Sequence, residues 1–338
     1  MKLSKYTLMA GFCFAPMVVL AQGITQSEDE IKQSVIDSVK KEFDGAMRDD
    51  PSLTIKTENI DYDVKHEILT VTGMEAVSTS TTDPFRVIVD RVQSVHPSVL
   101  ANKPLDEIFI PKNGFVSIEG MKIDVDYLLA SMKNDPNQVY TESDLAESKA
   151  YLDYFKGDDA FVRIDLRSDV NGDESQGLTS LSVVDVENVG TINVNANVGG
   201  IYALNGSSLT DQNLPMLAMG SLSLDSLTFG FTSSGLSEFV DLYLSQENKS
   251  KSELLSDIQS ELDKVSAKGT QLYKDEVTTK LYSALYESIN GGKEFNVSFS
   301  IKNINMGTVM ALMSQQSEQQ QSKFMRDTLQ LDVKASAL

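Results

Sequence analysis

Residues 219–244 read MGSLSLDSLTFGFTSSGLSEFVDLYL, and they join a strand to a helix. Apolar residues alternate in the first half, so they share one face of a strand. The alternation shifts by one at Asp225–Ser226, which predicts a β-bulge. After Ser233 and Gly235 the apolar spacing becomes that of an amphipathic helix. The strand residues are Leu222, Leu224, Leu227, Phe229 and Phe231, and the helix residues are Leu236, Phe239, Val240 and Tyr243.

The same strand-to-helix pattern occurs twice more. Residues 295–301 alternate and lead into a helical stripe of Met306, Val309, Met310 and Met313. Residues 115–123 form a predicted strand that leads into a helix over residues 125–132. The three copies are either an internal repeat or independent strand–helix junctions. Their irregular spacing is not that of a solenoid.

The remaining segments predict an α+β fold. Ser27 and Glu30 form a capping box before an amphipathic helix. Alternating strands then recur, and one-sided alternation favours antiparallel pairing. We therefore predict a large twisted, mostly antiparallel sheet with amphipathic helices packed on one face. Residues 22–338 form a single exported domain, or two halves (22–205 and 206–338) that share one continuous sheet, with a helical hairpin inserted at residues 250–290.

The N-terminus predicts an export signal at residues 1–21. Lys2 and Lys5 precede an apolar run over residues 6–20, and Ala21 fits a cleavage site. The alternative is an uncleaved anchor helix. Cys13 is the only cysteine, so the exported chain folds without disulfides, which favours a bacterial periplasmic or secreted protein. We expect no stable membrane span after removal of the signal.

The charge of the chain limits its partners. The sequence has 49 acidic and 29 basic residues, which gives a net charge of −20. No basic cluster occurs, so we expect no nucleic-acid partner.

The sequence offers few groups for catalysis, and we predict that the protein is not an enzyme and holds no cofactor. His66 and His96 are the only histidines, and no zinc-site spacing, nucleophile elbow or phosphate-binding loop accompanies them. Asp169, Asn171 and Asp173 have calcium-loop spacing, but an acidic hairpin turn explains them better than a metal site. Carboxylate chemistry of the glycosidase type remains a less favoured alternative.

The apolar helical stripes are the remaining candidate site. Methionine-rich surfaces adapt to variable apolar ligands. A groove between sheet and helices would shelter such a ligand, and an ordinary core is the alternative reading. The predicted groove residues are Leu236, Phe239, Val240, Tyr243, Met306, Val309, Met310 and Met313.

Two short segments resemble a known group of proteins. They are residues 60–73, which contain IDYD and ILTVTG, and residues 229–236, which contain the SGL step. Together with the targeting segment and the strand-to-helix junctions, they resemble bacterial envelope proteins of the AsmA-like type, including the YdgA/YihF-like group. The resemblance implies an inner-membrane anchor and envelope lipid handling, although this chain differs in its cleavable-looking signal.

The function that we predict is binding of lipid or another apolar ligand in the bacterial envelope. The alternative is a structural or interaction protein that binds another envelope protein.

Overall fold

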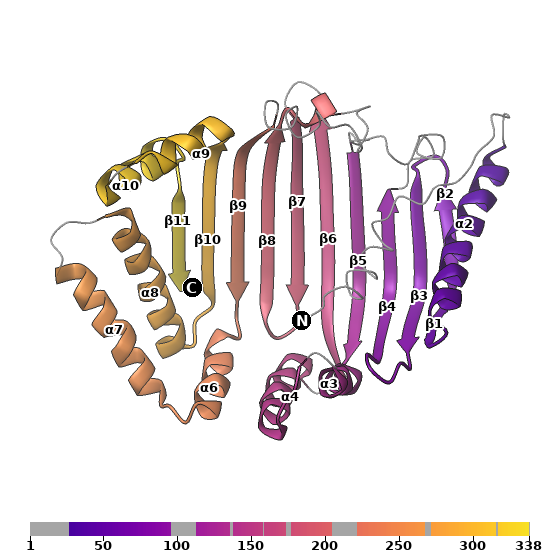
Figure 1. Ribbon diagram of the computed structural model, residues 1–338, viewed down its shortest axis with the longest axis horizontal. Helices are drawn as coiled ribbons and strands as arrows, with labels where there is room; N and C mark the ends of the chain where they lie inside the picture. Colours follow the sequence, from indigo (N-terminus) through magenta and orange to yellow (C-terminus); the bar gives the residue numbers. More distant parts are fainter. Residues whose placement is uncertain are drawn as a thin grey trace. The chain divides into compact units, whose positions relative to one another are not determined.

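The computed structural model describes residues 27–95, 113–135, 138–157, 159–173, 177–204, 222–267, 272–315 and 317–337. Its eleven strands belong to an open, mostly antiparallel sheet accompanied by helices, which confirms the predicted α+β class (Figure 1). The chain divides into an N-terminal unit (residues 1–107 and 113–169) and a C-terminal unit (residues 108–112 and 170–338). This division falls inside strand β6 (Phe161–Asp173) and not at residue 205.

In its described residues, the N-terminal unit contains a meander of strands and three helices. Hydrogen bonds join the strands in the order β1-β3-β4-β5, and β2 pairs with β3. The elements are α2 (Glu28–Asp49), β1 (Leu53–Lys56), β2 (Asn59–Asp63), β3 (Ile68–Ser78), β4 (Phe85–Val95), β5 (Asn113–Asp124), α3 (Val125–Asn134) and α4 (Glu142–Lys156).

Helix α2 packs on β1 and β2 of this unit's sheet. The predicted capping box is present, since the Glu30 amide donates to Ser27 Oγ and the Ser27 amide donates to Glu30 Oε2. The apolar side of α2 then packs on the strands and excludes water from their side chains. The buried cluster comprises Val35, Ile36, Val39, Ile60, Tyr62, Leu69, Val71, Ala76, Phe85, Val87, Val89, Val92 and Ile118.

The buried tyrosine of this cluster predicts a loss of stability in alkali. The Tyr62 side chain is 1% exposed, and burial, with the carboxylates of Glu67 and Asp63, raises its pKa to about 12 from the usual 10.0. Above pH 10 the unfolded chain ionises first, so this stabilisation is complete below pH 10 and declines as the pH rises through 12. The full loss is about 3 kcal/mol.

Urea unfolding at a series of alkaline pH values measures this loss. Tyr62→Phe removes the ionisable group and should remove this part of the decline. An equal decline in Tyr62→Phe and the parent chain would show that other groups cause it.

The C-terminal unit contains the strand order β7-β8-β9-β10-β11. Its register confirms the predicted bulge, because Ser226 pairs with Asn197 and Leu224 pairs with Val198, which leaves Asp225 as the extra residue. The elements are β7 (Gly177–Val186), β8 (Gly190–Gly199), the 3₁₀-helix η2 (Ile201–Leu204), β9 (Ser223–Ser233), α6 (Leu236–Gln246), α7 (Lys251–Ala267), α8 (Tyr273–Gly291), β10 (Phe295–Ile304), α9 (Met306–Met313), α10 (Glu318–Asp327) and β11 (Asp332–Ala337).

Helix α8 forms the core of this unit with the edge of its sheet. It packs on β10 and β11, and α6, α7 and α10 pack on α8 (Figure 1). Ala284 of α8 meets Phe295 and Val297 of β10 in the buried cluster. The two helices that we predicted at residues 250–290 are α7 and α8, which pack against each other, and α8 also packs on β10 and β11.

Candidate functional site

The structure separates the two halves of the predicted apolar groove. Strands β9 and β10 are antiparallel, with Ser233 opposite Phe295 and Leu224 opposite Ile304. Helix α6 follows the end of β9 and α9 follows the end of β10, so the helices begin at opposite ends of this ladder (Figure 1). Nine residues of extended strand span about 30 Å. The structure therefore places the two stripes at opposite ends of this ladder.

The stripe on α6 mostly faces its own unit. Leu236 packs against the cluster of α8 and β10, and Phe239 and Val240 are half-buried. Tyr243 is 41% exposed. This stripe belongs to the core, which is the alternative reading of the sequence.

The stripe on α9 faces outward. Met310 is 64% exposed and Met313 is 82% exposed, and Val309 is also exposed. The half-buried residues of this helix are Thr308, Ala311 and Leu312. Ala311 and Leu312 thus lie on the inward side of α9. The predicted methionine stripe lies on its solvent side. The side chain of Met306 lies outside the described part of the structure.

A different apolar surface is open in the C-terminal unit. Opposite partners in an antiparallel ladder share one face, so Val194 of β8, Phe229 of β9 and Phe299 of β10 form one row. The Phe229 and Phe299 rings are 6.5 Å apart between centroids. We call this surface the apolar sheet face, and it consists of Ile192, Val194, Leu227, Phe229 and Phe299.

The apolar sheet face continues into the part of the sheet that α8 covers, because Phe299 packs against the cluster of Ala284, Phe295 and Val297. The described α-helices of this unit pack mainly on β10, on β11 and on one another, and the short η2 contacts β7. Phe229 is 37% exposed, and the other four residues are half-buried. The alternation of β8 and of β9 is visible in the sequence, but only their pairing shows that the two rows form one surface.

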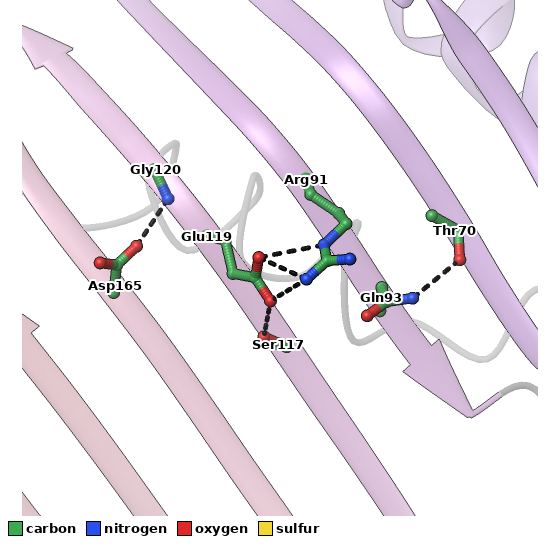
Figure 2. Close-up of polar contacts among 7 residues, drawn as sticks. All are labelled: Thr70, Arg91, Gln93, Ser117, Glu119, Gly120 and Asp165. Carbon is green, nitrogen blue, oxygen red and sulfur yellow. Dashed lines mark hydrogen bonds and ion pairs between the residues drawn. The ribbon is translucent and has the colours of Figure 1, made fainter.

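Polar side chains in the N-terminal unit pair across the strands (Figure 2). Arg91 Nη2 donates to both carboxylate oxygens of Glu119, at 2.7 and 2.6 Å, and Ser117 Oγ donates to the same carboxylate at 3.3 Å. The Gly120 amide donates to Asp165 Oδ1 at 2.6 Å. The Arg91–Glu119 bonds join β4 to β5 and the Gly120–Asp165 bond joins β5 to β6, whereas the Ser117–Glu119 bond lies within β5.

The carboxyl groups with a shifted pKa in the described residues all shift in the same direction. The Arg91 guanidinium holds the pKa of Glu119 below its usual range. Every other carboxyl pKa that is shifted in the described residues also moves down, at Asp63, Asp144, Asp153, Asp159 and Glu253. A glycosidase acid requires the opposite shift.

The structure places His66 in a turn and the candidate calcium ligands within a strand. His66 is exposed, and its Nδ1 lies 2.8 Å from Asp63 Oδ2 in a turn. Asp169 accepts from Arg167 Nε at 2.7 Å. Asp169, Asn171 and Asp173 lie within strand β6, where alternate residues are about 6.6 Å apart and cannot wrap around an ion. Among the described residues, no cluster of three or more His, Cys, Asp or Glu side chains is placed to hold a metal.

The export signal at residues 1–21 and His96 lie outside the described residues. Within the described part of the chain, no helix combines the length and the apolar character needed to cross a membrane. Comparison with family models and with curated proteins finds no match to this chain.

Proposed function

We propose that this protein is a non-catalytic envelope protein that binds a lipid or another apolar ligand on the apolar sheet face. The observation that carries the proposal is the exposure of Phe229 in the middle of an apolar row that no described helix of its unit covers extensively. The ligand therefore lies on β8 and β9, and not between the stripes of α6 and α9.

The N-terminal unit shows what the same kind of surface looks like when it is covered. There, Val71 of β3 and Val92 of β4 are opposite partners, and they are 5% and 7% exposed because the cluster that contains α2 encloses them. On the apolar sheet face, the equivalent apolar side chains remain partly open. Covering apolar surface stabilises a protein by about 25 cal/mol for each Å² removed from water. An apolar ligand on β8 and β9 would gain this free energy.

The expectations from the sequence agree with this function. An exported, disulfide-free chain meets lipids in the bacterial envelope, and the resemblance to AsmA-like proteins points to lipid handling. The proposed location is the periplasm or the outside of the cell.

Transfer of a fluorescent phospholipid from dilute micelles to the full chain tests this proposal. The intact chain should take up the lipid, and Ile192→Ser combined with Phe229→Ser should weaken binding about tenfold or more because apolar contact is lost. Leu181→Ser is the matched control, since Leu181 is 41% exposed on the opposite face of the same sheet. Absence of uptake by the intact chain, or an equal loss in Leu181→Ser, would contradict the proposal.

A second candidate function rests on α9, whose exposed methionines suit an apolar partner protein. Its outward side is built from Val309, Met310 and Met313. If another envelope protein docks there, Met310→Ser with Met313→Ser should abolish its crosslinking to the chain and leave the fold intact. Retention of the crosslink would exclude α9 as the contact. Deletion of residues 250–290 is not a usable test, because α8 belongs to the core.

A further inference from the structure

The polar face of the C-terminal sheet contains an open hollow of about 360 Å³. It lies over β8, β9, β10 and β11, on the face opposite to the apolar sheet face, because its side chains alternate with those of Val194, Phe229 and Phe299. The side chains that line it are those of Asn193, Thr232, Asn296, Ser298, Lys334 and Ser336. The main chain at Gly230 forms its floor.

The strand register explains why the hollow is there. Asn193, Gly230, Ser298 and Lys334 form one row across the four strands. Gly230, the second residue of this row, has no side chain. The side chains on either side of it therefore border an open space. A volume of about 360 Å³ lies in the range of small-molecule sites, which begins at about 300 Å³.

The backbone does not require glycine at position 230. A Cβ atom there would meet nothing nearer than 3.8 Å, and the residue has no positive φ. Glycine in the interior of a strand weakens the strand, and it often marks a place where a ligand approaches the backbone. Gly190 in the same sheet is different, because its Cβ would be 2.0 Å from the Thr232 carbonyl oxygen. Neither close packing nor backbone conformation therefore accounts for the glycine at position 230.

The groups around the hollow are mostly amides and hydroxyls, and hydrogen bonds fix the orientations of Thr232 and Asn296. Thr232 Oγ1 donates to Asn296 Oδ1 at 2.5 Å, and Asn296 Nδ2 donates to Glu294 Oε1 at 3.0 Å. Amides and hydroxyls both donate and accept hydrogen bonds, as the hydroxyl groups of a sugar require. The one cation, Lys334, lies 3.7 Å from the Asp332 carboxylate, which offsets its charge.

We propose that this hollow binds an uncharged, polyhydroxylated ligand of mono- or disaccharide size. The orientation of Asn296 and Thr232 is set before binding, so little order is lost when hydroxyl groups replace water. The chain's net charge of −20 disfavours anionic ligands, and the local charge of Lys334 is balanced. This site is independent of the apolar sheet face, because the two lie on opposite sides of the sheet.

Saturation-transfer NMR and titration calorimetry on the full chain test the proposal. The probes are a neutral disaccharide, an N-acetylated hexosamine and, as the charged arm, a hexuronic acid. At least one of the two neutral sugars should bind saturably. Gly230→Thr fills the hollow with a residue that suits a strand, and it should weaken binding about tenfold or more by displacing several hydrogen bonds.

Thr228→Val is the matched control. Thr228 lies on the same strand and the same face, two residues from Gly230 and outside the lining. It should bind as the parent chain does, and urea unfolding should show that both variants fold. Failure of both neutral sugars to bind the parent chain would overturn the proposal, as would undiminished binding by Gly230→Thr. Binding of the uronate alone would also overturn it, because Lys334 would then select anions.

Discussion

Val39→Asp is expected to unfold the N-terminal unit, with a loss of about 4 kcal/mol or more in the free energy of unfolding. Val39 is 1% exposed and lies in the apolar cluster between α2 and the sheet. An aspartate there must bring its carboxylate out of water into an apolar environment, or α2 must leave the sheet. Either outcome removes the helix that packs on β1 and β2 and opens the apolar cluster that it shares with β3 and β4.

Urea unfolding, followed by hydrogen exchange at the amides of β3, measures this effect. Lys40→Asp is the matched control, since Lys40 is the next residue of α2 and is exposed. Both variants place an aspartate in the same helical turn, so the difference between them reports burial. If Lys40→Asp cost as much as Val39→Asp, helix propensity or net charge would explain the loss instead.

Gly190→Ala is expected to destabilise the C-terminal unit by about 2–6 kcal/mol, as the sum of backbone strain and overpacking. Gly190 has a φ of +137°, which side chains with a Cβ rarely adopt. The added Cβ would also be 2.0 Å from the Thr232 carbonyl oxygen and 2.9 Å from the Ser233 Cα atom. These are main-chain atoms of β9, so β8 and β9 must separate locally.

Gly230→Ala is the control for this substitution, with the opposite expected sign. Its Cβ finds only ordinary contacts at 3.8 Å, so the variant should be more stable than the parent chain by about 0.5–1 kcal/mol. Denaturant unfolding of both variants and hydrogen exchange in β8 measure the difference. A similar stability for the two variants would show that the close approach at Gly190 relaxes without cost.

Features that depend on neighbouring residues could be predicted from the sequence. The three strand-to-helix units are present as β5 and α3, β9 and α6, and β10 and α9. The capping box at Ser27 and the bulge at Asp225 are also present. Each of these depends on the apolar period or on a hydrogen bond between residues a few positions apart.

The candidate site depended on long-range pairing, and the sequence does not contain this information in a local form. The spacing of apolar residues predicts that Met310 and Phe239 lie on apolar stripes of two helices. Because β9 and β10 are antiparallel, those helices begin at opposite ends of the β9–β10 ladder. Likewise, the pattern of β9 places Phe229 on one face and Gly230 on the other. Only the register with β8 and β10 makes an apolar surface of one face and a polar hollow of the other.

The sequence by itself determined the elements, the α+β class and the faces of each strand, because side-chain period is a local property of the backbone. Tertiary structure decided which apolar faces are covered. Helix α8 lies on β10 and β11 and leaves Phe229 partly open, whereas α2 closes the cluster around Val71. Two apolar faces with similar alternation thus have different surroundings, since burial depends on which distant element packs against each face.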